Sequence, residues 1–253
     1  MRQPSHVRTN RDVMILKLGK ETALVLGCDS AGGIGSKPHD SVRVNAEVVG
    51  KFTARVALME VLSVGAVPIC VVNTLSVEPR PTGSEIIKGI RKELRRAHVS
   101  PTIPTLFGSE RNVETKQTGV GVTILAEAPL HNLRIGKCRE NDLVLAVGLP
   151  YVGSEVLKSE RRKLIADLTD LLRLLKVPYI HEVIPVGSRG ILREAETLAK
   201  DSDLRFRPLL RSGIDLRKSA GPATVLLCSL SPNNWSEFQQ NIDKPLNVVG
   251  ELR

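Results

Sequence analysis

Residues 23–37 read ALVLGCDSAGGIGSK, an apolar run that ends at Asp29 and continues into a glycine-rich segment. The apolar residues 23–27, with residues 14–18 before them, predict two short strands joined as a hairpin. A carboxylate at the end of a strand suits Mg²⁺, and glycines let backbone N–H groups approach a phosphate closely. An ordinary turn explains the pattern equally well, so the residues alone leave both interpretations open.

The glycine-rich segment offers several groups that would contact a phosphate if it binds a nucleotide. These are Gly32, Gly33, Gly35 and the side chain of Lys37. The pattern G-x-x-x-x-G-K-[ST] is absent, so the segment is not a P-loop.

The rest of the first half contains apolar runs that are typical of strands and, between them, apolar residues at helical spacing. We expect a strand around 42–49, a helix over 53–64 that stops at Gly65, and strands over 69–75 and 120–126. Thr82 and Glu85 have the spacing of a capping box and predict the start of another helix. Residues 99–118 are polar and rich in Pro and Thr, so they should contain a long loop.

A polar joint over residues 129–142 separates the two halves. The second half predicts strands over 143–148, 179–186 and 224–229, an amphipathic helix spanning 164–175, and a helix over 191–200. Both halves mix strands and helices, which predicts an α/β or α+β fold with domains over 1–128 and 139–253.

The composition is that of a packed soluble protein. The chain has 253 residues, 42% of them hydrophobic and only 3% aromatic, with a net charge of +9. The basic residues are dispersed and not interleaved with aromatics, so nucleic acid is not an expected partner. No apolar signal core or membrane span is found, which predicts a cytoplasmic protein without membrane contact. The four cysteines lack metal-ligand spacing and are expected to be buried free thiols: Cys28, Cys70, Cys138 and Cys228.

Three further features have both a functional and an ordinary interpretation. Glu60 is the only charge in the apolar run 56–64, so it must be solvated on a helix surface, paired with another charge or bound to metal. Glycines and hydroxyls at 108–110 and 118–121 suit a nucleotide pocket or any turn. The turn 185–190 precedes a predicted helix, where anions bind readily and Arg189 would add charge, but a plain tight turn fits equally well.

The order of these motifs resembles the aminoimidazole ribonucleotide synthetase superfamily, which includes selenophosphate synthetase and thiamine-monophosphate kinase. The family's acidic residue before G-A-x-P is similar to Glu60 with Gly65-Ala-Val-Pro68, and its T-G-x-G-V-T is similar to Thr118-Gly-Val-Gly-Val-Thr123. The segment Glu140-Asn-Asp-Leu-Val-Leu-Ala-Val-Gly148 resembles the strand that begins the family's C-terminal domain.

This resemblance implies an N-terminal domain that binds ATP and Mg²⁺ and pairs with its twin in a homodimeric β-barrel. Asp29 falls at the family's metal-binding Asp, Glu60 at a position where Asp is usual, and Asp40 at a possible further ligand. Lys51 lies where some members carry an Arg that faces the nucleotide.

Within the superfamily, the loops of this chain look most like those of the α-ribazole kinase group, enzymes that phosphorylate α-ribazole in cobamide (cobalamin-type) salvage. The similarity rests on residues 29–38, on Gly108-Ser109 with Gln117-Thr118-Gly119, and on 185–191. It implies a kinase in which Asp29 and Lys37 act on the transferred phosphoryl group. The implied ATP and phosphate contacts include Gly108, Ser109, Thr118 and Gly119, and the implied substrate cleft is formed by Gly187, Ser188, Arg189 and Gly190.

Several departures from the family pattern keep two alternatives open. Val56 replaces a common Asn, Pro185 stands where many members have Asp, and the usual Asp-Asp segment near the N-terminus is missing. No Cys lies in an N-terminal mobile loop, which disfavours selenophosphate synthesis. The alternatives are an ATP-dependent ribonucleotide ligase or cyclase and a non-catalytic dimer that binds nucleotide.

Overall fold

The computed structural model describes residues 6–209 and 212–253. The chain divides into two compact units, Met1–Leu133 and Arg134–Arg253, and each is described by itself. Among the described residues, no helix has the length and apolar character that crossing a membrane requires.

The first unit is built on a six-stranded sheet with the order β1-β2-β3-β8-β6-β7. All neighbouring strands are antiparallel except β6 and β7. The sheet strands are β1 (Val7–Asn10), β2 (Val13–Leu18), β3 (Thr22–Gly32), β6 (Val67–Leu75), β7 (Thr105–Ser109) and β8 (Gly119–Pro129). The other elements are the short strands β4 (Ile34–Gly35) and β5 (Val42–Arg43), the helices α1 (Ala46–Ser63) and α2 (Ser84–Arg96), and the turns η1 (Pro79–Gly83) and η2 (Leu130–Asn132).

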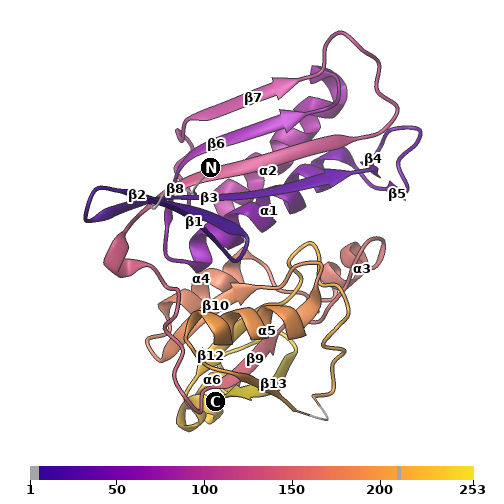
Figure 1. Cartoon of the computed structure of the whole chain (residues 1–253). Helices are drawn as coiled ribbons and strands as arrows, with labels where there is room; N and C mark the ends of the chain where they lie inside the picture. The colour runs from indigo at the N-terminus through magenta and orange to yellow at the C-terminus, as the bar shows by residue number, and fades with distance from the viewer. Residues whose placement is uncertain (1–5, 210–211) are drawn as a thin grey trace. The chain divides into compact units, whose positions relative to one another are not determined.

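Helices α1 and α2 lie against the same face of this sheet (Figure 1). Two glycines let their backbones approach closely. A Cβ on Gly50 would stand 2.0 Å from the carbonyl oxygen of Ile86, and one on Gly89 would stand 2.0 Å from that of Glu47. Alternate side chains of β3, β6 and β8 pack under the helices and form a core of small and branched aliphatic residues.

The opposite face of the sheet carries apolar side chains that stay partly exposed. Cross-strand register places three rows on it: Leu16, Leu24, Glu127 and Val67; Met14, Leu26, Leu125 and Cys70; and Cys28, Thr123, Val72 and Leu106. The described sheet is open, with β1 and β7 at its edges, and is not a closed barrel. Cys28 is exposed because it points to this face, so the expectation of four buried thiols is wrong; only Cys228 is buried, although all four are free.

The second unit has a five-stranded antiparallel sheet with the order β10-β12-β9-β13-β11. Its strands are β9 (Leu143–Val147), β10 (Ile180–Pro185), β11 (Phe206–Pro208), β12 (Leu226–Leu230) and β13 (Leu246–Leu252). Its helices are α3 (Glu155–Arg161), α4 (Leu168–Lys176), α5 (Gly190–Asp201) and α6 (Trp235–Gln240), with the turn η3 (Pro232–Asn234). Ile191, Ala195 and Leu198 of α5 belong to the buried core of this unit.

The mixed α/β class is confirmed, but several expected elements differ. Only Val42–Arg43 (β5) of the strand expected around 42–49 is confirmed, because Asn45 caps α1 by accepting a hydrogen bond from the Glu47 N–H at 2.9 Å and the residues after it are helical. The capping box of Thr82 and Glu85 is also wrong: α2 begins after Gly83, and the Thr82 hydroxyl donates to Glu78 instead.

Three further differences concern element bounds. Strand β3 continues to Gly32, so Asp29 lies within a strand and only the later part of the glycine-rich segment is a loop. The polar stretch 99–118 includes strand β7, and the amphipathic segment 164–175 contains a shorter helix, α4, that begins after its N-cap Asp167.

Candidate functional site

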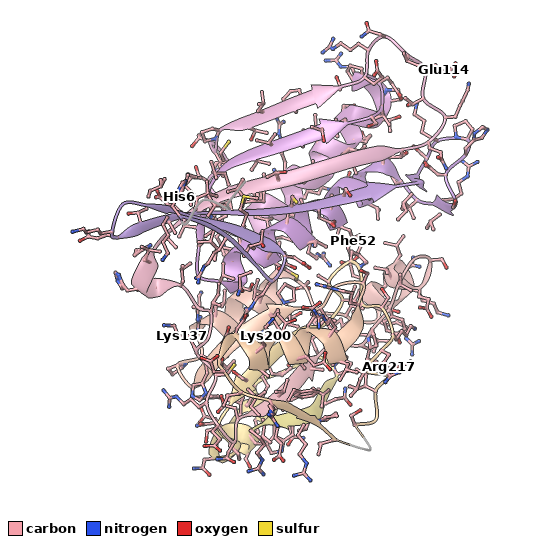
Figure 2. The ribbon with its side chains drawn as sticks, viewed as in Figure 1. His6, Phe52, Glu114, Lys137, Lys200 and Arg217 are labelled. Atoms are coloured by element: carbon pink, nitrogen blue, oxygen red, sulfur yellow. The ribbon has the colours of Figure 1, made fainter. Side chains whose placement is uncertain are left out.

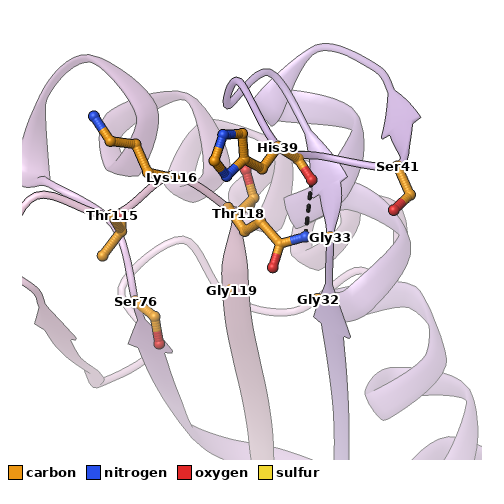
Figure 3. A pocket seen from close by; sticks show the side chains of 10 residues that line it. Gly32, Gly33, His39, Ser41, Ser76, Thr115, Lys116, Thr118 and Gly119 are labelled. Carbon is orange, nitrogen blue, oxygen red and sulfur yellow. Dashed lines mark hydrogen bonds between the residues drawn. The ribbon is translucent and has the colours of Figure 1, made fainter.

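A pocket of about 650 Å³ opens in the first unit, where β3 and β6 end and β8 begins. It is lined by Gly32, Gly33, His39, Ser41, Ser76, Thr115, Lys116, Gln117, Thr118 and Gly119. Ser41 and Ser76 lie on opposite sides of the start of β8, with His39 and Lys116 nearby (Figure 3). The pocket thus combines three chain segments that are distant in sequence.

The chemistry of the lining favours an anionic ligand. It includes the ammonium of Lys116, the imidazole of His39 and several hydroxyls, and no carboxylate belongs to it. The Lys116 ammonium has one acidic neighbour, Glu114, at 2.6 Å. Glu114 is highly exposed on the loop between β7 and β8 (Figure 2), so this ion pair is weak and a bound anion can compete with it.

A buried carboxylate holds the two loops of this pocket together. Asp40 is only 6% exposed. One oxygen accepts a hydrogen bond from the Thr118 N–H at 2.8 Å, and the other accepts from the Thr118 hydroxyl at 2.8 Å and the Lys37 N–H at 2.7 Å. Gly35 lies directly beneath, where an added Cβ would stand 2.4 Å from the Thr118 hydroxyl oxygen. With three donors already bound, Asp40 is better suited to shaping the loops than to binding metal.

Further hydrogen bonds connect the same loops. The Gly33 N–H donates to the Thr118 carbonyl at 2.9 Å, and the His39 N–H donates to the Lys116 carbonyl at 2.9 Å. The Gln117 side-chain amide donates to the His39 carbonyl at 2.8 Å, the contact drawn in Figure 3. The pocket walls are therefore fixed relative to each other before any ligand arrives.

Lys37 is not among the residues that line the pocket. Its ammonium binds the carboxylate of Glu78, which also accepts a hydrogen bond from the Thr82 hydroxyl. Burial alone would raise the pKa of Glu78, but the hydrogen bonds from Lys37 and Thr82 prevail and lower it to about 2. The lysine is held at the base of the loop as one half of a part-buried ion pair.

Asp29 lies on β3 with its side chain on the face covered by the helices. Its register partner is Val122, whose side chain is fully buried on that face. Burial raises the pKa of the Asp29 carboxyl; a hydrogen bond from the Ser30 N–H opposes the rise, the charge of Asp12 adds to it, and the pKa reaches about 6. A part-buried carboxylate with a raised pKa is a candidate ligand for a cation.

The two other predicted metal ligands are placed differently. Glu60 of α1 is 5% exposed, and its Cβ lies 3.2 Å from the position of a Cβ on Gly27, two residues before Asp29 on the same strand face. Asp40 belongs to the loop clamp instead. Within the described residues, no three His, Cys, Asp or Glu side chains converge as a metal site. Asp29 and Glu60 still fit a hard cation such as Mg²⁺, because both supply carboxylate oxygens to one side of the sheet.

The remaining predicted ATP contacts divide into two groups. Gly32, Gly33, Thr118 and Gly119 line the pocket. The other three, Lys51, Gly108 and Ser109, do not line it. Lys51 lies on α1, and its ammonium is 4.9 Å from the centre of the ring of Phe52, which is labelled in Figure 2. Gly108 and Ser109 belong to the edge strand β7, paired with β6.

The predicted substrate cleft, Gly187, Ser188, Arg189 and Gly190, lies in the second unit at the start of α5. Its own chain already covers this turn. The Leu192 N–H donates to the Leu216 carbonyl at 2.8 Å, and a Cβ on Gly190 would stand 2.9 Å from the Arg217 carbonyl. These contacts are those of a tight structural turn, and they leave the helix terminus less open to an anion.

Sequence reasoning did not identify five polar residues that line the pocket. They are His39, Ser41, Ser76, Thr115 and Lys116. His39 and Ser41 flank Asp40 in sequence, and Lys116 precedes the Thr-Gly motif by two residues, so proximity to those motifs was the available signal. Ser76 has no such signal, because it enters the pocket only through the pairing of β6 with β8.

Comparison with known proteins gives one match to part of the first unit and several matches to nearly the whole chain. Residues 10–123 match the model for the AIR synthase related protein, N-terminal domain. No curated protein matched the sequence. Among solved structures, thiamine-monophosphate kinase from Stenotrophomonas maltophilia K279a is 15% identical, with a TM-score of 0.64, over 98% of this chain and 89% of that one.

Two other solved structures give similar values. AaThiL complexed with AMPPCP and TMP is 16% identical, with a TM-score of 0.64, over 96% of this chain and 84% of that one. HypE of E. coli, a hydrogenase maturation protein, is 15% identical, with a TM-score of 0.62, over 90% of this chain and 79% of that one. Residues 10–123, less than half of the chain, thus match the AIR synthase related N-terminal domain, and nearly the whole chain shares the fold of these structures.

Proposed function

We propose that this protein is an ATP-dependent small-molecule kinase whose first unit, predicted as residues 1–128, binds the nucleotide. The observation that carries the proposal is the pocket at the ends of β3 and β6, which combines Lys116, His39 and hydroxyls without a lining carboxylate. Such a lining favours phosphate oxygens, and phosphoryl transfer depends mainly on positioning and charge neutralisation. A structural neighbour complexed with the ATP analogue AMPPCP adds support.

In this proposal Asp29 and Glu60 hold Mg²⁺ on the helix-covered side of β3. The ion would supply positive charge that neutralises the triphosphate. The chain's own part is to fix geometry: Asp40 fastens the two pocket loops through Thr118, and Glu78 keeps the Lys37 ammonium at the base of the glycine loop. Lys37 would approach the phosphates only by exchanging Glu78 for a phosphate oxygen.

We propose α-ribazole as the acceptor. The support is the similarity of residues 29–38, 117–119 and 185–191 to the α-ribazole kinase group. The second unit, predicted as residues 139–253, would carry acceptor contacts at the turn 187–190. The covered state of that turn makes Ser188 and the exposed Arg189 its better candidates, because the backbone of Gly190 is already packed against residue 217.

We also propose that the protein is a homodimer that pairs through the uncovered face of the sheet. The support is the exposed apolar character of that face, on which Met14 is 41%, Val67 is 64% and Leu106 is 67% exposed. Contiguous apolar side chains on a sheet face are typical of a surface that a partner covers. A second copy would bury these rows and give the β-barrel that the family resemblance implies.

The test is ADP release from Mg·ATP with and without α-ribazole, next to AMPPCP binding by calorimetry. We expect AMPPCP to bind, and we expect stimulation by α-ribazole that disappears in Asp29→Ala. The matched control is Asp243→Ala, which removes an exposed carboxylate in the second unit, 82% exposed. This control should leave both measurements unchanged.

The outcomes distinguish the proposed kinase from the alternative functions. AMPPCP binding without stimulation by α-ribazole would discard this acceptor and leave the nucleotide site standing. ADP release that requires a ribonucleotide with an amide or amidine co-substrate would indicate the ligase reaction. If AMPPCP does not bind, the proposal as a whole is wrong.

A further inference from the structure

The pocket at the ends of β3 and β6 has a lining without apolar side chains. Of the described residues that form it, three are glycines and the other seven carry hydroxyl, amide, imidazole or ammonium groups. Pockets that enclose a flat heterocycle are lined mostly by hydrophobic and aromatic side chains, with a few polar groups that fix its orientation. The lining therefore suits the phosphate chain of a nucleotide better than its base.

Much of the backbone around the pocket is already bound within the chain. Five lining residues donate their N–H groups to protein oxygens at 2.7–2.9 Å: Gly33, His39, Ser41, Ser76 and Thr118. Adenine and guanine differ in the groups on their edges, since adenine has an amino donor where guanine has a carbonyl acceptor. These five N–H groups cannot read that difference without breaking the bonds that fix the loops. The groups that face a ligand are therefore mainly side chains.

The pocket is also open to water. Among the described residues that line it, Thr118 is buried and the others are half-buried or exposed. A site discriminates strongly between similar ligands when the wrong one leaves buried polar groups unpaired. In an open site water takes the place of a missing hydrogen bond, so a base bound here would be distinguished only weakly from another.

Phosphate oxygens, in contrast, meet suitable donors in this pocket. Hydroxyls of Ser41 and Ser76 lie on opposite sides of the start of β8, with His39 and Lys116 nearby (Figure 3). Hydrogen bonds from an ammonium to a phosphate are about twice as strong as those between neutral groups. Gly32 keeps the space in front of these donors open, because a Cβ at this position would meet no atom within 4 Å.

We propose that this pocket binds the phosphate chain of a nucleoside triphosphate and does not distinguish its base, so that the phosphoryl donor is a nucleoside triphosphate of any base. This inference rests on the proposed function and names the donor class of the same site. It also makes inorganic tripolyphosphate, which has the phosphate chain without the nucleoside, a competitor of ATP.

The test is calorimetric binding of AMPPCP, its guanine counterpart GMPPCP and inorganic tripolyphosphate to the full chain, each with Mg²⁺. We expect the dissociation constants of AMPPCP and GMPPCP to agree within about tenfold, the lower end of what a selective contact gives. We also expect tripolyphosphate to displace AMPPCP. A preference for AMPPCP beyond that factor, or a failure of tripolyphosphate to displace it, would overturn the inference.

Gly32→Leu tests whether the ligands occupy this pocket. The new side chain enters the pocket without meeting protein atoms at its Cβ, so the fold should be kept, which the melting temperature checks. All three ligands should lose at least about tenfold in affinity, which corresponds to about 1.4 kcal/mol. Thr22→Leu, at an exposed position at the opposite end of β3, is the matched control and should change none of these affinities. Unchanged affinities in a folded Gly32→Leu would overturn the inference.

Lys116→Gln tests the phosphate contact at an exposed position, where the fold does not depend on the side chain. It should weaken all three ligands by a similar factor of about three to ten, because solvent screens part of the charge. Lys20→Gln, exposed between β2 and β3, is its control and should have no effect. A wild type that binds none of the three ligands would overturn both this inference and the proposed function. Binding of AMPPCP alone would overturn this inference and leave the kinase proposal standing.

Discussion

Replacing Asp29 with Asn should make the protein more stable and less functional at the same time. The carboxyl lies half-buried on β3, and burial, with the charge of Asp12, raises its pKa from 3.8 to about 6 although the Ser30 N–H opposes the rise. An ionised carboxylate with a raised pKa destabilises the folded state at neutral pH. Asn removes the charge and keeps the size of the side chain.

The sign and the size follow from proton linkage. Between pH 3.8 and about 6 the folded protein holds a proton that the unfolded chain has released, so stability falls as pH rises through this window. Above about pH 6 the ionised carboxylate lowers the free energy of unfolding by its full amount. This amount is at most about 3 kcal/mol, because one pKa unit corresponds to about 1.4 kcal/mol. Because solvent screens a carboxyl that is only half-buried, we expect about 1–2 kcal/mol.

The assay is urea unfolding in EDTA at pH 7.5 and at pH 4. Asp29→Asn should gain about 1–2 kcal/mol at pH 7.5 and almost nothing at pH 4, where the folded wild-type carboxyl is already protonated. The exposed Asp243→Asn should show no gain at either pH. A variant that is less stable at pH 7.5, or equally stabilised at both pH values, would refute the burial argument. We also expect Asp29→Asn to lose Mn²⁺ binding. That loss would show that the carboxylate binds a cation although it lowers the stability of the folded protein.

Three other changes test the pocket and the core. Gly35→Ala should lose about 2–3 kcal/mol by urea unfolding, because its Cβ meets a hydroxyl at 2.4 Å, whereas Gly32→Ala, with nothing within 4 Å, should change little. Glu78→Gln should remove stability that the wild type holds above pH 4.5 and loses as pH falls toward 2, so the two proteins should converge in acid titrations followed by circular dichroism. Gly50→Ala should lower the free energy of unfolding by about 3 kcal/mol or more, and the melting temperature with it, because its Cβ would stand 2.0 Å from the Ile86 carbonyl oxygen.

Local sequence patterns predicted the elements whose signal is local. The apolar run before Asp29 and the stop at Gly65, which has a φ of +83°, were both predicted from neighbouring residues. Of the strand predicted over 42–49 only Val42–Arg43 is a strand, because branched residues favour strands while the cap at Asn45 starts a helix at the residues that follow it. The capping-box spacing at Thr82 failed because its hydroxyl is bound to Glu78.

The candidate site was less predictable because its contacts join distant positions. Asp40 and Thr118 are separated by 78 positions, and nothing near either residue shows that the carboxylate is saturated by the other loop. The ion pair of Lys37 and Glu78 spans 41 positions and removes the lysine from the pocket lining. The motifs around both charged residues indicated ligand contacts, whereas the fold binds each residue to another part of the protein.

The charged and polar groups of the first unit therefore divide by whether the fold satisfies them. Asp40 and Glu78 are bound by donors from their own chain, which makes them supports of the pocket. Asp29 and Asn73 lie in one row of the helix-covered face, one with a raised pKa and the other without a partner among the described residues. Because burial raises the pKa of Asp29, its carboxylate lowers the stability of the sheet at neutral pH, so its presence there is best explained by a ligand that offsets this cost.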